Sequence, residues 1–149
     1  RIPVQDRAAA WLHDALALVE RGRVLIVDYA DTTASMANRP QQQWLRTYRG
    51  HERGGDPLDA PGTQDITVEV AVDQLAAVRP PDANWSQAEF LQAHGIDELV
   101  DEGRRLWAER AHLGDLAAIR ARSRVTEAEA LLDPAGLGAF RVLEWIVTP

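Results

Sequence analysis

Cysteine is absent from this chain of 149 residues. Without thiolates the chain forms neither a disulfide nor a zinc site that depends on cysteine ligands. The absence is typical of proteins from a reducing compartment. We therefore expect a cytoplasmic protein.

Long apolar runs and an excess of positive charge are also lacking. No run approaches the roughly 18 apolar residues of a membrane-spanning helix, and the opening RIPVQDRAAAWL lacks the pattern of a secretion signal. We therefore expect no membrane span. The chain has 16 Lys and Arg against 23 Asp and Glu, a net charge of −7. Because nucleic-acid binding depends on a positive surface that releases counterions, we also expect no nucleic-acid partner.

The first elements predict an α/β unit. Residues 6–21 carry apolar side chains, among them Trp11, Leu12 and Val19, at spacings of three and four, which predicts a helix. The run RVLIVDYA, residues 23–30, follows a glycine and is continuously apolar over four positions. Such a run is typical of a strand covered on both faces. A helix, a glycine and a buried strand in this order favour an α/β fold.

Further elements follow downstream. Residues 67–78 read as a strand and then a short helix, and SQAEFLQAHG reads as a helix with a capping box between Ser86 and Glu89. Residues 96–121 are mostly helical in pattern, and a further short capped helix is expected from Thr126. The run AFRVLEWIV, residues 139–147, predicts a buried strand at the chain end.

Two buried strands do not make a stable sheet alone. We therefore expect their neighbours to come from upstream sequence or from another chain. The chain also starts without an initiator methionine, and we expect all of 1–149 to be the carboxy-terminal portion of one longer domain.

The most unusual stretch is polar and leaves the first strand at its carboxyl end, after Asp28 and Tyr29. Open α/β sheets bind ligands at that edge. We expect residues 30–66 to form a long ligand-facing loop, because long loops in compact domains are typical of lids and binding segments. A flexible insertion is the alternative, against which Trp44 argues as an apolar anchor.

Several side chains in or beside this loop are candidates for chemistry. His51 lies close in sequence to Arg46 and Arg49, whose guanidinium forks suit carboxylate or phosphate groups, so a general base is one interpretation and a solvated polar loop is the other. Asp28 and Asp65 are placed to bracket one site and accept a proton, although Asp65 also suits a simple turn cap.

Other common signatures are missing. The chain contains no GxSxG, no GxxxxGK[ST] and no GxGxxG after a strand, and its four histidines show no helical metal-ligand spacing. We expect no metal site.

Four segments then occur in a telling order: GRVLIVDYA, RTYRGHERGGDPLDAPGTQDIT, SQAEFLQAHGI and LLDPAGLGAFRVLEW. They resemble the carboxy-terminal half of the MidA-type S-adenosylmethionine-dependent methyltransferases. That family has a strand ending in Asp-Tyr-Gly, an RGYR-H segment, PG-x-x-D-I-T, a TQ-x-x-FL-x-x-x-GI helix and a late MG-x-x-F-K-V-L strand. The resemblance covers about residues 9–147.

The chain departs from this pattern at four positions. Ala30 replaces the glycine after Asp-Tyr, Ser86 replaces a threonine, Leu137 stands where methionine is common, and Glu69 stands where a histidine is usual. Ala30 and Glu69 touch the expected functional edge. The pattern suggests a bacterial branch of the family.

The resemblance implies an α/β fold: the carboxy-terminal part of a seven-stranded Rossmann-like methyltransferase sheet with added helices. The final strands would be the fifth, sixth and seventh, with the last one antiparallel and inserted between its neighbours. The glycine-rich loop that binds S-adenosylmethionine would lie upstream of this chain, so no cofactor-binding residue is assigned within it. Residues 30–66 would cover the substrate side.

The resemblance further implies methyl transfer from S-adenosylmethionine to a protein nitrogen, because eukaryotic relatives are associated with arginine methylation in respiratory complex I assembly. The alternative is a non-catalytic binding or assembly module that completes a sheet with a partner chain. The expected site residues are Asp28, Asp65 and His51 as catalytic groups and Tyr29, Arg46, Arg49 and Thr67 as substrate-binding groups.

Overall fold

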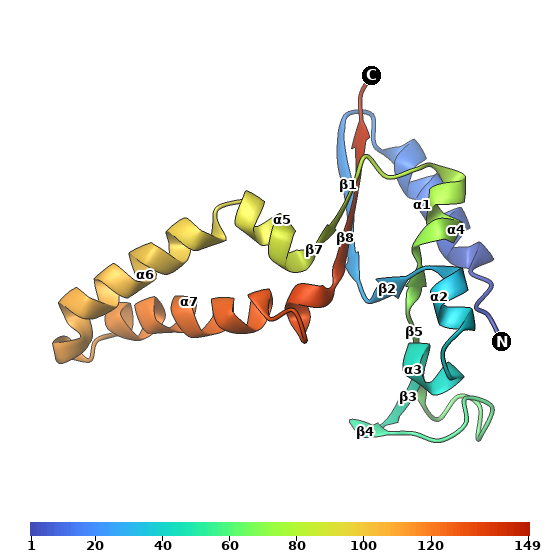
Figure 1. The fold of residues 1–149 in the computed structure, drawn as a ribbon, viewed down its shortest axis with the longest axis horizontal. Helices are drawn as coiled ribbons and strands as arrows, with labels where there is room; N and C mark the ends of the chain where they lie inside the picture. Colours follow the sequence, from blue (N-terminus) through green and yellow to red (C-terminus); the bar gives the residue numbers. More distant parts are fainter. The chain divides into compact units, whose positions relative to one another are not determined.

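The computed structural model describes residues 1–149, which form two compact units (Figure 1). Unit 1 comprises Arg1–Asp82 and Glu144–Pro149, and unit 2 comprises Ala83–Leu143. The mixture of helices and small sheets confirms the expected α/β class. None of the helices is long and apolar enough to cross a membrane.

The elements of unit 1 are, in chain order, α1 (Asp6–Leu18), β1 (Gly22–Asp28), β2 (Ala30–Asp31), α2 (Thr33–Ala37), α3 (Gln41–Trp44), β3 (Leu45–Arg49), β4 (Glu52–Arg53), β5 (Asp65–Val68), β6 (Val70–Ala71) and α4 (Val72–Val78). Unit 2 contains β7 (Ala83–Ser86), α5 (Gln87–Ala93), α6 (Ile96–Arg110), the 3-10 turn η1 (Ala111–Leu113), α7 (Leu116–Leu132) and the 3-10 turn η2 (Leu137–Ala139). Strand β8 (Arg141–Val147) runs from unit 2 into unit 1.

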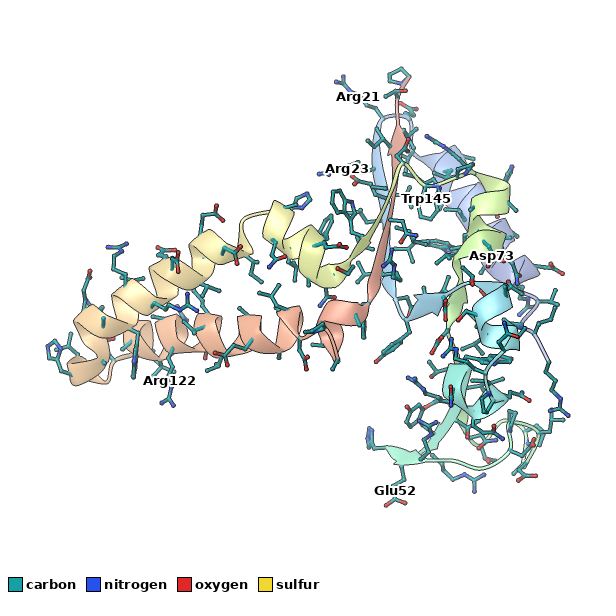
Figure 2. All side chains as sticks on the ribbon, in the orientation of Figure 1. Arg21, Arg23, Glu52, Asp73, Arg122 and Trp145 are labelled. Atoms are coloured by element: carbon teal, nitrogen blue, oxygen red, sulfur yellow. The ribbon has the colours of Figure 1, made fainter.

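Strand β8 is the middle strand of a three-stranded sheet with the order β1-β8-β7. Its residues Val142, Leu143 and Trp145 are almost completely buried. In unit 1 the Trp145 indole N–H donates to the Arg79 carbonyl over 2.9 Å. Trp145 is labelled in Figure 2. The prediction of a buried terminal strand between two neighbours is confirmed.

Strand β1 differs from its prediction. Its side chains alternate in burial, and Leu25 and Val27 are 42% and 51% exposed. Successive side chains of a strand point to opposite faces, and the face that carries Leu25 and Val27 is left partly open. The prediction that both faces of β1 are covered is therefore wrong for the structure of this chain.

The segment 30–66 also differs from its prediction as a long loop. It contains β2, α2, α3 and the antiparallel sheet β4-β3-β5 (Figure 1). Gly50 and His51, with φ of 57° and 69°, form the two-residue turn between the paired Arg49 and Glu52. Positive φ at both central positions suits the twist of a tight hairpin. The longest part of the segment outside helices and strands is residues 54–64.

Apolar anchors explain why this polar segment folds. Met36 on α2 and Trp44 on α3 are buried in one cluster with Ala71 of β6, and Leu45 and Val68 pack against that cluster. Leu45 and Val68 are also partners in the register of β3 and β5. The polar sheet is thus held to unit 1 through a small core of its own.

Unit 2 is mainly a pair of helices, α6 and α7, that pack side by side (Figure 1). Gly114 has a φ of 61° and separates them, and the Asp115 carboxylate caps α7 by accepting from the Ala118 N–H. The predicted helix over 96–121 is therefore two helices. The separate helix predicted from Thr126 is wrong, because α7 continues through that residue without a break to Leu132.

Helix α5 begins with the predicted capping box. The Ser86 hydroxyl accepts from the Glu89 N–H, and the Glu89 carboxylate accepts from the Ser86 N–H over 2.7 Å. The Ser86 hydroxyl also donates to that carboxylate over 2.8 Å. The hydrogen bonds from the Ser86 backbone and hydroxyl lower the pKa of Glu89 below its ordinary value.

We expect Ser86→Ala to lower the free energy of unfolding by about 1 kcal/mol, because an alanine cannot cap the first turn of α5. Urea denaturation at neutral pH measures the change. Ser123→Ala, in the middle of α7, is the matched control and should change the value by no more than about 0.5 kcal/mol.

The effect also has a predicted pH dependence. A lowered carboxylate pKa contributes stability above the ordinary pKa, and that contribution is lost as pH falls through the lowered value. The difference between the wild type and Ser86→Ala should therefore narrow in acid. A difference that grows as the pH falls contradicts the assignment.

Candidate functional site

Four polar side chains share one face of the sheet formed by β3 and β5. Arg46 pairs with Thr67, and Tyr48 pairs with Asp65. Because alternate residues of a strand point to the same side, these four side chains form one surface, which we call the β3–β5 face. The Arg46 guanidinium lies over the Tyr29 ring, 5.5 Å from its centroid, so the face also includes the residue that follows β1.

The β3–β5 face joins several residues expected from the sequence. Arg46, Asp65 and Thr67 lie on it, and Tyr29 contacts it through Arg46. The Tyr29 carbonyl accepts from the Val70 N–H over 2.8 Å, beside the parallel pair of Ala30 and Val70. The backbone at the end of β1 is therefore fixed next to β6, which directly follows β5.

Asp28 lies at a different pocket. Its carboxylate accepts from the Tyr29 N–H over 2.7 Å. With the apolar side chains of Trp11, Leu25 and Leu75 it lines a cavity of about 450 Å³. This cavity combines apolar walls with a single carboxylate at the carboxyl end of β1.

Arg49 and His51 are not on the β3–β5 face. Along β3, Arg49 lies on the side opposite to Arg46 and Tyr48. Its guanidinium donates to the Thr63 hydroxyl over 2.6 Å. His51 is exposed in the hairpin turn, and no hydrogen bond or ion pair joins it to Asp28 or Asp65. The roles of all seven expected site residues stay predictions.

A cluster that sequence reasoning missed lies next to the β3–β5 face and reaches it at Arg46. The Arg39 guanidinium donates to the Asp31 carboxylate over 2.7 Å and to the Glu69 carboxylate over 2.8 Å. We call these three residues the Arg39 clamp. Glu69 is 13% exposed, and its second oxygen lies 3.7 Å from the Arg46 guanidinium. The hydrogen bond to Glu69 raises the pKa of Arg39 above its ordinary value, more than burial lowers it.

The clamp fixes the geometry of the site. Asp31 ends β2, and Glu69 lies between β5 and β6. One guanidinium therefore ties the chain leaving β1 to the chain returning from the polar sheet. In sequence, Glu69 was visible only as a departure from the family pattern, and Arg39 lies eight residues from one partner and 30 from the other. No local spacing indicates such a contact.

The structure holds no group of three or more His, Asp or Glu side chains arranged to bind a metal ion.

Comparison with known proteins assigns the family. Residues 1–91 match the model of a family described as "Putative S-adenosyl-L-methionine-dependent methyltransferase". This match covers more than half of the chain, and the protein belongs to that family. No curated protein matches the chain.

Two solved structures from Burkholderia thailandensis are similar to this chain. An uncharacterised protein has 25% sequence identity to this chain and a TM-score of 0.74. The alignment covers 96% of the present chain and 37% of the chain of that protein. A member of the same superfamily, described as a "likely methyl transferase" and bound to S-adenosyl-homocysteine, has 26% identity and a TM-score of 0.66, over 96% and 36%. The present chain thus spans little more than a third of the length of these proteins.

We expect Arg39→Met to lower the free energy of unfolding by about 1–2 kcal/mol, because it leaves Asp31 and Glu69 close together without the guanidinium that bridges them. The loss is small because all three side chains retain some solvent contact, which weakens their ionic interactions. Chemical denaturation checks the value.

The matched control is Arg53→Met, which removes an exposed guanidinium from strand β4 without breaking an ion pair. Equal destabilisation by the two substitutions contradicts a special role for the clamp.

Proposed function

We propose that the protein acts as a MidA-type S-adenosylmethionine-dependent methyltransferase and that this chain supplies its substrate-side half. The family match over residues 1–91 carries the proposal. The similar structure bound to S-adenosyl-homocysteine, which is the demethylated form of the methyl donor, supports it.

The proposed domain has a seven-stranded Rossmann-like sheet, with β1, β7 and β8 as its last three strands. The order β1-β8-β7 supports this, because the last strand in sequence lies between the two earlier ones. The exposed Leu25 and Val27 support a further covering layer on β1. We propose that this layer comes from residues that precede the chain or from a partner chain.

Methyl transfer is an in-line displacement, so the protein acts mainly by positioning the reactants and excluding water. S-adenosylmethionine supplies the sulfonium methyl group. We propose that Tyr29, Arg46 and Thr67 contact the acceptor on the β3–β5 face. Asp65 on the same face orients an acceptor nitrogen and takes up its proton.

Asp28, His51 and Arg49 occupy less direct positions. Asp28 lines the apolar cavity at the end of β1, where we propose that it faces the reacting groups. His51 and Arg49 are proposed to contact the acceptor at the hairpin β3–β4, outside the reacting centre. The exposed position of His51 supports a binding role more than a role as a base.

The groups of this chain do not by themselves fit the whole cofactor. The cavity beside Asp28 offers one carboxylate and mostly apolar walls, and the chain has no glycine-rich turn after a strand. We therefore assign no cofactor-binding residue here and propose that most of the cofactor pocket is built elsewhere.

For the acceptor we propose a nitrogen on another protein, arginine being the first candidate by resemblance to the MidA family, in the cytoplasm of a bacterium. The bacterial source of the two similar structures supports the last point. The competing proposal is a non-catalytic assembly module that uses the open face of β1.

Thermal melting with S-adenosylmethionine tests the proposal, because a ligand that binds only the folded state raises the melting temperature. We expect no shift for the chain alone and a clear shift when the residues encoded upstream are added. No shift in either sample supports the assembly module instead.

A second test addresses Asp65 within the methyl-transferring protein. Asp65→Asn should reduce the transfer of labelled methyl groups to protein by about 100-fold, which is the lower range for loss of acid–base assistance. Asp59→Asn, a matched exposed carboxylate of the same polar segment, should keep the wild-type rate. Equal rates for both variants would remove Asp65 from the mechanism.

A further inference from the structure

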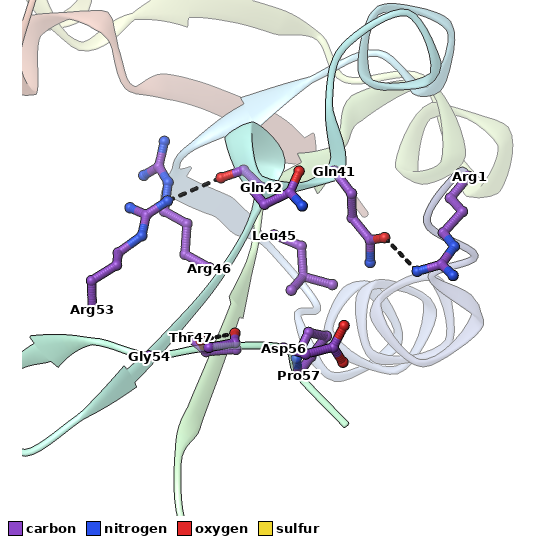
Figure 3. A pocket seen from close by; sticks show the side chains of 11 residues that line it. Arg1, Gln41, Gln42, Leu45, Arg46, Thr47, Arg53, Gly54, Asp56 and Pro57 are labelled. Carbon is purple, nitrogen blue, oxygen red and sulfur yellow. Dashed lines mark hydrogen bonds between the residues drawn. The ribbon is translucent and has the colours of Figure 1, made fainter. Parts of the chain in front are cut away.

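A second pocket of unit 1 is lined by three arginines. It has a volume of about 280 Å³, and its walls include Arg1, Arg46 and Arg53 together with a single acidic side chain, Asp56 (Figure 3). We call it the arginine pocket. The chain as a whole carries a net charge of −7, so this concentration of guanidinium groups runs against the average composition of its surface.

The arginines of this pocket are held mainly by neutral acceptors. The Arg53 guanidinium donates to the Gln42 carbonyl over 3.0 Å, and Arg1 donates to the Gln41 side-chain oxygen over 2.8 Å. No carboxylate lies within ion-pair distance of either guanidinium. Each guanidinium carries five N–H donors, so most donors of Arg1 and Arg53 remain available to a ligand.

Arg46 is only partly neutralised. It donates to the Gln43 carbonyl over 3.2 Å, and its nearest carboxylate, on Glu69, lies 3.7 Å away and is already bound by Arg39. Asp56 offsets only one of the three guanidinium charges, and one of its carboxylate oxygens accepts from the Leu58 N–H over 2.8 Å. The pocket therefore has a net positive charge.

Aromatic rings and backbone contacts set the shape of the pocket. Arg46 lies over Tyr29 at 5.5 Å, and Arg53 lies over Tyr48 at 5.9 Å, while Figure 3 shows the two guanidiniums together at one end. Arginine stacked on a ring loses less freedom when it binds a ligand. The Thr47 hydroxyl donates to the Gly55 carbonyl over 2.8 Å, which fixes the wall between β3 and residues 54–55.

We propose that the arginine pocket binds an oxyanion, a carboxylate or a phosphate group, between the guanidiniums of Arg46 and Arg53. Planar guanidinium forks match the geometry of both groups. This part of the proposal depends only on the residues of the arginine pocket and not on the proposed function.

In the methyltransferase the bound oxyanion belongs to the methyl acceptor, and this second part rests on the proposed function. Arg46 contributes to both the pocket and the β3–β5 face. The acceptor nitrogen therefore has an acidic or phosphorylated group as a near neighbour.

Titration of the isotopically labelled chain with inorganic phosphate and with glutarate, followed by NMR of the arginine side-chain N–H groups, tests the site. We expect saturable shifts at Arg46 and Arg53 with a dissociation constant on the order of 1 mM, weakening as salt is added. Tighter binding of phosphate or of glutarate shows which oxyanion the pocket prefers.

Three variants make the test specific. Arg53→Gln should weaken binding by roughly tenfold, the change expected for one charge-assisted hydrogen bond. Asp56→Asn should strengthen it by roughly two- to fivefold, because the competing negative charge is removed and the side-chain oxygen still accepts from Leu58. Arg21→Gln, at the residue before β1 (Figure 2), is the matched control and should bind like the wild type.

The two variants of opposite sign separate binding from folding, since a folding defect cannot strengthen binding. Shifts that do not saturate, or that sodium chloride reproduces at equal ionic strength, overturn the proposal, as does equal weakening by Arg53→Gln and Arg21→Gln. Saturable binding without methyl transfer would leave the site standing and remove the proposed function. Methyl transfer by the protein, together with oxyanion binding that Arg53→Gln leaves unchanged, would support the proposed function and reject the arginine pocket as the binding site.

Discussion

The Arg39 clamp is the constraint on which the candidate site depends. One guanidinium binds the carboxylates of Asp31 and Glu69 at 2.7 and 2.8 Å, and these residues belong to the chain leaving β1 and the chain returning from the polar sheet. Two carboxylates held this close repel each other unless a cation lies between them. A network of this kind stabilises more than an isolated exposed ion pair.

The clamp also orders the neighbouring β3–β5 face. Glu69 reaches Arg46 with its second oxygen, and Arg46 lies over Tyr29. Through Glu69 and Arg46, Arg39 constrains the residues that we propose to bind a ligand on the β3–β5 face and in the arginine pocket. Glu69 is one of the four positions at which this chain departs from the MidA pattern that it resembles, and its contacts give that departure a structural role.

Sequence patterns predicted the elements whose signals are local. The capping box of α5 is set by Ser86 and Glu89, three residues apart, and the buried β8 by one short apolar run; both are confirmed. Long-range contacts were not predictable in this way. Trp44 was expected to anchor the polar segment, but its packing with Met36 and Ala71 was not. The Arg39 clamp joins residues up to 38 positions apart, which no local pattern indicates. The open face of β1 was not predicted, because an apolar run indicates that a strand prefers burial but does not show whether another element of the same chain covers it.

Nuclear Overhauser contacts between the Tyr29 ring and the Arg46 side chain test most directly whether the clamp sets the site. We expect these contacts in the wild-type chain, their loss in a folded chain in which Arg39 is replaced by methionine, and their retention when Glu98, on α6, is replaced by glutamine. Unchanged Tyr29–Arg46 contacts in the absence of the Arg39 guanidinium would contradict the account, because the site would then be ordered by something other than the clamp.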